Sequence, residues 1–125
     1  MQKFISIGAN ISIPFSDLPY DLIADYNKKL YRVQIKSMWN FKDGVLRLNT
    51  VQGHKSPGLR SYKNEVDFIA AYCAKTSHCI LIPINEVIEP KMTFRYKKSN
   101  NNQIKNLTTD INKFNFDNII TSLNP

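Results

Sequence analysis

Three residues in the first third of the chain, Asp21, Gln34 and Lys36, have types and spacing that suit phosphodiester hydrolysis. That reaction needs a cation to offset the charge that builds on the phosphate, and it needs an activated water. Asp21 can supply an anionic oxygen to Mg²⁺, while the Gln34 side chain and the Ile35 backbone carbonyl can supply neutral oxygens. Lys36 can orient the attacking water or stabilise the developing negative charge. Taken alone the pattern is weak, because many solvated hairpins carry an Asp followed by Gln-X-Lys.

Two expected strands must bring these residues together. Residues 20–26 (YDLIADY) and 30–37 (LYRVQIKS) predict neighbouring strands, and the Asn and Lys at 27–28 form a plausible tight turn. With a two-residue turn, Asp21 faces Gln34 across the antiparallel pair, and the lysine two residues further on projects from the same side. A slip of one residue in the register would separate the three side chains.

The rest of the chain predicts a sheet with helices packed on it, in an α/β or α+β arrangement. Residues 64–74 (NEVDFIAAYCA) predict a helix capped by Asn64, and 51–62 predict an exposed, mobile, basic loop. A polar loop is expected at 99–102, and a short helix at 103–112. Further strands are expected at 10–15, 45–50 after an Asp43-Gly44 turn, 79–84 and 92–97.

The charge of +7 is unevenly placed. Nine basic residues lie between Lys28 and Lys63, where Asp43 is the one acid. A basic surface beside a local acidic cluster suits a protein that holds phosphates and places a cation among them. The alternative is a lysine-rich composition with ordinary solvated faces, and charge alone leaves the two readings about even.

Apolar runs and cysteines point to a soluble cytoplasmic protein. No apolar run approaches the roughly 20 residues that span a bilayer, and the first residues have too short an apolar run for a secretion signal. Cys73 and Cys79 are too few for a disulfide framework and have apolar neighbours, which favours buried thiols over a zinc site.

Taken in order, the segments YDLIAD, LYRVQIKS, GVLRLNT, EVDFIAAYC, CILIPI and TFRYKKSNNNQ resemble one family. They are similar to PD-(D/E)XK nucleases of the type encoded in cyanobacterial group I introns, the homing endonucleases. The resemblance runs from about Phe4 to Phe116. It implies a restriction-endonuclease-like fold, with a mixed β-sheet core flanked by helices, in a single domain over 1–125.

The resemblance also implies an activity and a site. The activity is that of a Mg²⁺-dependent endonuclease, with Mn²⁺ as a substitute ion, acting on double-stranded DNA as a homodimer or homotetramer. Asp21 matches the aspartate of the family's second core strand, and Lys36 matches the family lysine. Gln34 matches a position that is Glu in most relatives and Gln in the intron-encoded branch.

We expect the strand at 45–50 and the loop at 52–62 to reach DNA, together with Ser37, Lys42 and Lys63 outside these two segments. Basic residues there can hold phosphates, and Asn49 or Gln52 can touch base edges. The full expected set is Ser37, Lys42, Arg47, Asn49, Gln52, Lys55, Arg60 and Lys63.

One departure from the family pattern matters for activity. Family members usually begin with a helix that carries a Gly-Glu pair, whereas no acid precedes Asp17 here, so we expect either a truncated helix or a site that runs with fewer carboxylates. Three alternatives to the endonuclease hypothesis follow. They are a catalytically inactive DNA-binding module on the same fold, a junction-resolving or toxin-type nuclease, and a small domain that binds no nucleic acid.

Overall fold

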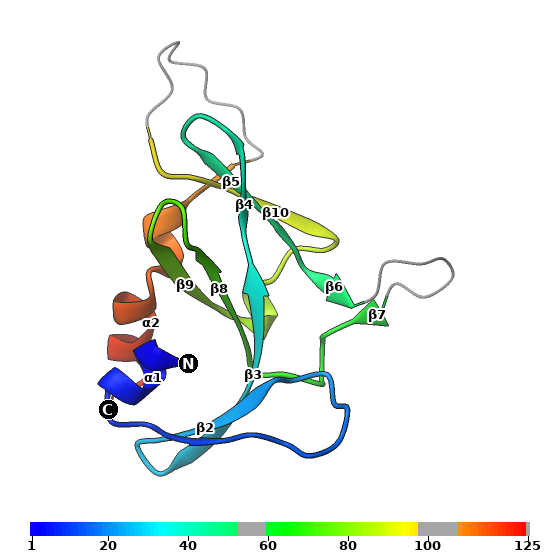
Figure 1. Cartoon of the computed structure of the whole chain (residues 1–125), viewed down its shortest axis with the longest axis vertical. Helices are drawn as coiled ribbons and strands as arrows, with labels where there is room; N and C mark the ends of the chain where they lie inside the picture. Colours follow the sequence, from blue (N-terminus) through cyan, green and yellow to red (C-terminus); the bar gives the residue numbers. More distant parts are fainter. Residues whose placement is uncertain (53–59, 98–107, 125) are drawn as a thin grey trace.

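The computed structural model describes residues 1–52, 60–97 and 108–124, and its strands form three sheets (Figure 1). The five-stranded sheet runs in the order β1 (Asn10–Ser12), β2 (Leu22–Tyr26), β3 (Lys29–Ser37), β8 (Phe68–Cys73), β9 (His78–Pro83). The four-stranded sheet runs in the order β11 (Thr109–Asp110), β10 (Lys91–Arg95), β5 (Val45–Asn49), β4 (Trp39–Lys42). A two-stranded sheet pairs β6 (Val51–Gln52) with β7 (Arg60–Ser61). The helical segments are α1 (Gln2–Ser6), α2 (Phe116–Ser122) and the 3-10 turns η1 (Ile84–Glu86) and η2 (Ile111–Phe114).

Three layers result from this arrangement. One apolar cluster fills the space between the two large sheets and includes Leu46, Leu48, Phe94, Ile69 and Ile82. A second cluster covers the other face of the five-stranded sheet, where α1 and α2 lie (Figure 1). Within the described ranges, no helix is long and apolar enough to cross a membrane.

The β2–β3 hairpin has the predicted turn and register. Asn27 and Lys28 have φ angles of 53° and 66°, as a two-residue turn with two left-handed positions requires. Tyr26 pairs with Lys29, and Leu22 pairs with Val33. Continuing that register by one residue sets Asp21 against Gln34.

The helix predicted at 64–74 is wrong. Residues Phe68–Cys73 form β8, a central strand that is parallel to β3 and antiparallel to β9. Five of its six residues are buried, which is typical of a strand covered on both faces. Asn64 has a φ angle of 66°, which a helix N-cap does not adopt, and it sits in a turn that precedes the strand.

The strand β3 leads directly into β4 and so joins the two large sheets (Figure 1). Met38 lies at the junction, is buried, and donates its backbone N–H to the Tyr72 carbonyl at 2.7 Å. The Asp43-Gly44 turn then connects β4 to β5 as predicted, with Gly44 at a φ angle of 82°. Phe41 is the extra residue in a β-bulge, because Asn40 pairs with Leu46 and Lys42 with Val45.

Other predictions hold in part. The segment at 51–62 is not wholly an exposed loop, because β6 pairs with β7 and the first and last residues of the segment, Val51 and Tyr62, are buried. Residues 53–59 lie outside the described part. Residues 109–114 are β11 and η2 rather than a helix, and 98–107, including the polar loop, lie outside the described part. The predicted strands at 10–15, 45–50, 79–84 and 92–97 are present with shifted ends.

Candidate active site

Asp21 lies where the β2–β3 ladder ends. Its backbone N–H donates to the Val33 carbonyl at 2.9 Å, and its Oδ2 accepts the Ile35 backbone N–H at 2.8 Å. The carboxylate therefore accepts the hydrogen bond that a backbone carbonyl would accept if the β2–β3 ladder continued. This contact fixes the side chain against β3 although Asp21 is exposed.

The Ile35 carbonyl is directed to the same edge of β3. In an extended strand the N–H and C=O of one residue point to the same side, and the Ile35 N–H already meets Asp21. The Gln34 Nε2 lies 3.4 Å from the Ile35 carbonyl oxygen. The Gln34 amide and the Ile35 carbonyl thus lie together, beside the carboxylate.

Lys36 is half-buried on the side of β3 that faces the second sheet. Its Nζ donates to the Val51 carbonyl at 3.4 Å and lies 5.0 Å from the centroid of the Tyr62 ring. Burial lowers the pKa of Lys36, and the Asp21 carboxylate opposes that change. Burial also raises the pKa of Tyr62, with smaller contributions from Asp21 and Glu65. Asp21, Lys36 and Tyr62 therefore share one electrostatic environment.

Glu65 is a second carboxylate at the border of this site, and sequence reasoning did not find it. Its Oε2 accepts from the Gln52 Nε2 at 2.6 Å, and its Oε1 lies 3.7 Å from Nη2 of Arg60. The same Gln52 nitrogen donates to the Ser61 carbonyl at 3.0 Å. The predicted helix at 64–74, capped by Asn64, would put Glu65 in its first turn. In the structure it lies just before the strand that pairs with β3.

The donors at the edge of β3 fit a hard divalent cation. Asp21, Gln34 and Ile35 offer one carboxylate, one amide and one carbonyl oxygen, all of the kind that Mg²⁺ prefers. Among the described residues, no group of three or more His, Cys, Asp or Glu could enclose a metal ion. A site with one carboxylate suits an ion that keeps several coordinated waters and binds phosphate oxygens at its remaining coordination positions.

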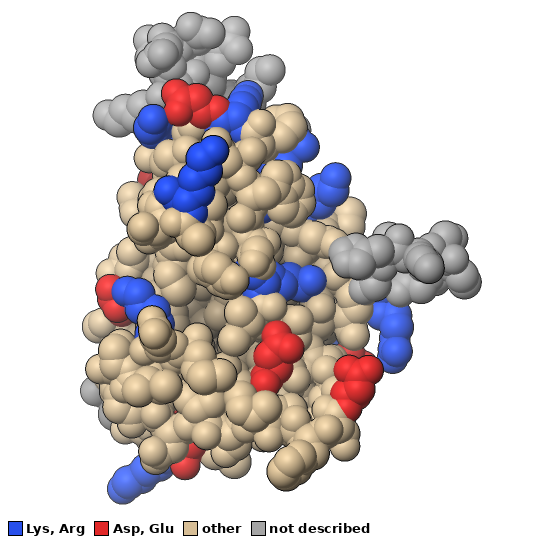
Figure 2. Space-filling view, viewed as in Figure 1, with Lys and Arg blue, Asp and Glu red and all other residues tan. Residues whose placement is uncertain are grey.

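A basic face adjoins the site on the outer side of the four-stranded sheet. Arg47 and Asn49 alternate along β5 with the core residues Leu46 and Leu48, so they point away from the core. Their partners across the ladders are Trp39 on β4 and Thr93 and Lys91 on β10. None of β4, β5 and β10 carries an Asp or Glu. Figure 2 shows Lys and Arg side chains gathered over the upper part of the molecule, where the β4–β5 hairpin lies in Figure 1.

Phe41 and Arg47 form a stacked pair on this face. The guanidinium carbon of Arg47 lies 3.3 Å from the Phe41 ring centroid. The Arg47 Nε is buried and has no hydrogen-bond partner within the described structure. Stacking on the Phe41 ring holds the guanidinium in place on this face.

The remaining predicted DNA contacts differ in their surroundings. Ser37 and Lys42 are exposed near the basic face, and Lys63 is exposed beyond β7. The Arg60 side chain is 71% exposed while pairing with Glu65, and Lys55 lies outside the described residues. Residues of this face that were not predicted are Trp39, Phe41, Lys91, Thr93 and Arg95. The pairing of β10 with β5 spans distant parts of the chain, so no local pattern could have revealed it.

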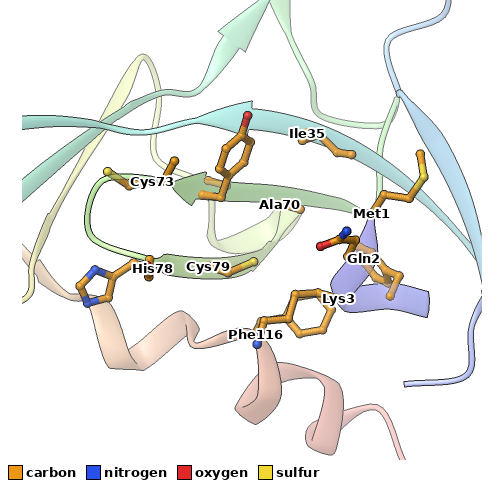
Figure 3. Close-up of a pocket in the computed structure, with 14 residues that line it drawn as sticks. Met1, Gln2, Lys3, Ile35, Ala70, Cys73, His78, Cys79 and Phe116 are labelled. Atoms are coloured by element: carbon orange, nitrogen blue, oxygen red, sulfur yellow. The ribbon is translucent and has the colours of Figure 1, made fainter. Parts of the chain in front are cut away.

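A separate hollow of about 470 Å³ lies between the β8–β9 hairpin and the two helices (Figure 3). Cys79, Ala70 and Phe116 line it, together with the first residues of the chain. Its lining contains no Asp or Glu. The candidate active site is therefore at the end of the β2–β3 hairpin and not in this hollow.

The fold is a mixed α+β arrangement of the restriction-endonuclease-like class. The family model described as PD-(D/E)XK endonuclease matches residues 1–117, and the chain belongs to this family. The structure is similar to that of a bacterial homing endonuclease, I-Ssp6803I, with a TM-score of 0.73 and 20% sequence identity. That match covers 96% of this chain and 83% of the other. Comparison with curated proteins gave no match. The predicted family and fold class are confirmed.

Proposed function

We propose that this protein is a Mg²⁺-dependent endonuclease that hydrolyses phosphodiester bonds in double-stranded DNA. The proposal rests on one observation: at the end of the β2–β3 hairpin, the Asp21 carboxylate accepts the Ile35 N–H beside the Gln34 amide. The Lys36 side chain projects from the same side of β3 as Gln34, and the Asp21 carboxylate raises the pKa of its amine against the effect of burial. The chain also belongs to a family of endonucleases.

Each group has a distinct task in this proposal. Asp21, Gln34 and the Ile35 carbonyl would hold Mg²⁺, or Mn²⁺ in its place, which when bound offsets phosphate charge and activates water. Lys36 places a positive charge beside the phosphate that is attacked. Because Lys36 is half-buried, its charge is screened less than that of an exposed lysine, which strengthens its effect on the developing negative charge.

The basic face supports a duplex as the ligand. A sheet face that carries cations and amides suits both phosphate contacts and readout of base edges in a groove. Arg47, Lys42 and Lys91 would hold phosphates, and Asn49 would reach base edges. We extend the proposal to a homodimer or homotetramer, because cutting both antiparallel strands with one kind of site calls for copies related by two-fold symmetry.

Supercoiled plasmid is the substrate that tests the proposal, since nicked and linear products separate on a gel. With Mg²⁺ we expect nicks and then linear DNA, and with EDTA in place of Mg²⁺ we expect intact supercoils. Salt-sensitive DNA binding without cleavage would identify an inactive binding module instead. Cleavage of branched DNA with duplex DNA left intact would contradict the duplex substrate.

A further inference from the structure

A hollow of about 400 Å³ opens beside the lysine of the candidate active site. It is lined by Lys36 and Ser37 at the end of β3, Trp39 at the start of β4, and Asn49 on β5. The bend at Met38, where the chain passes from one sheet to the other, brings Lys36 and Trp39 to the same hollow. The hollow therefore joins the candidate site to the basic face.

Trp39 lines this hollow and is an exposed aromatic residue. It is 43% exposed on a face whose other side chains are largely polar or charged. Phe41, the neighbouring exposed aromatic, already stacks on Arg47. Within 1–52, 60–97 and 108–124, no ring or cation stacks on Trp39. An exposed aromatic surface among cations is the arrangement on which nucleobases stack in proteins that bind unpaired strands.

Asn49 offers a polar edge on the same hollow. Its Oδ1 accepts the Val51 backbone N–H at 3.3 Å, which orients the amide and leaves the two Nδ2 hydrogens for another acceptor. An amide donor can meet the ring nitrogen or carbonyl oxygen of a nucleobase. The volume of the hollow falls within the range of pockets that hold small ligands.

We propose that this hollow takes one nucleobase that has left the DNA stack, with the base stacked on Trp39 and its edge against Asn49. The inference rests on the proposed nuclease function and deepens it, because it names the substrate class. DNA with an unpaired or weakly stacked base next to the cut site should bind more tightly than a fully paired duplex. Such a base loses little stacking and pairing energy when it enters a protein pocket.

Trp39 is the single tryptophan of the chain, so its emission reports directly on the hollow. The test titrates the protein, in EDTA to prevent cleavage, with a matched duplex and with the same duplex carrying one extrahelical base. We expect the bulged duplex to quench Trp39 emission and to bind about tenfold tighter in fluorescence anisotropy. Trp39→Ala should remove that preference, and Trp39→Phe should keep most of it. The matched control is Tyr72→Ala, which truncates an aromatic residue of similar exposure (46%) on β8.

Equal affinity for the two duplexes, or no DNA binding at all, would overturn the inference. It would also be overturned if Trp39→Phe lost the preference as completely as Trp39→Ala does, or if Tyr72→Ala lost it as well. Neither readout involves cleavage. Mg²⁺-dependent nicking with no preference for the bulged duplex would therefore reject the inference alone, and a Trp39-dependent preference without nicking would reject the nuclease proposal alone.

Discussion

Replacing Lys36 by methionine tests the role of its charge while keeping an unbranched chain beside the Tyr62 ring. In the proposed mechanism Lys36 stabilises negative charge that develops on the phosphate. Loss of one such preorganised group costs enzymes about 10²–10³ in rate. We therefore expect the rate of Mg²⁺-dependent nicking by Lys36→Met to fall by about that factor.

The same substitution should change stability little. It removes the weak hydrogen bond to the Val51 carbonyl and the contact with the Tyr62 ring, each worth about 1 kcal/mol. It also removes a half-buried charge, and the lowered pKa of Lys36 shows that burial disfavours this charge. The two effects oppose one another, so we expect the free energy of unfolding to change by no more than about 1 kcal/mol.

The assay is single-turnover nicking of supercoiled plasmid with enzyme in excess, alongside anisotropy binding and urea unfolding. Lys29→Met is the matched control, because Lys29 lies on the same strand, is exposed, and sits at the opposite end of the hairpin. It should nick at the wild-type rate. If Lys36→Met nicked as fast as wild type while folded and bound to DNA, Lys36 would have no part in the reaction. If the control lost activity to the same extent, a general effect of charge would explain the result.

Three further predictions follow from the site and the fold. Asp21→Asn keeps an oxygen for the Ile35 N–H but removes the charge, so Mg²⁺ affinity measured by calorimetry should fall, and unchanged affinity would refute the ligand assignment. Because the pKa of Lys36 is lowered, the nicking rate of the wild-type protein should fall, relative to that of Lys36→Arg, as the pH rises through that pKa. Parallel pH-rate profiles for the two proteins would show that the proton on Lys36 is not needed. At pH values between the lowered pKa of Lys36 and its ordinary pKa, the unfolded state binds more protons than the folded state. The contribution of Lys36 to the free energy of unfolding therefore rises with pH over that range. Gly44→Ala should destabilise the fold by about 1–3 kcal/mol in urea unfolding, since its Cβ would lie 2.9 Å from the Lys97 Cβ at a φ angle of 82°. Gly8→Ala has a similar φ angle and open space around the new Cβ, so it should lose less, and an equal loss would show that the contact with Lys97 is unimportant.

The part of the site that local patterns could predict is the β2–β3 hairpin. Its turn needs two left-handed residues, and a two-residue turn determines which residues face each other. The juxtaposition of Asp21 and Gln34, with Lys36 on the same side, follows from the alternation of side chains along the two strands. The contact between Asp21 and the Ile35 N–H did not follow, because it exists only where the ladder ends.

The error at 64–74 shows why the rest could not be predicted. The segment FIAAYC is apolar almost throughout, and such a run is equally consistent with a buried strand and with a buried stretch of helix. Its parallel pairing with β3 decides the matter, and that pairing joins segments about 35 residues apart. Glu65 was misplaced for the same reason, and the contribution of β10 to the basic face depends on a pairing between segments that lie still farther apart in the chain.

The most direct test of the account is a crystal structure of the protein with duplex DNA and Ca²⁺, a cation that, like Mg²⁺, binds oxygen ligands. We expect a cation bound to the Asp21 carboxylate and to a phosphate oxygen at the end of the β2–β3 hairpin, with the Lys36 amine beside that phosphate. A cation and a phosphate bound elsewhere, with the side chains of Asp21, Gln34 and Lys36 in contact with neither, would contradict the proposed site.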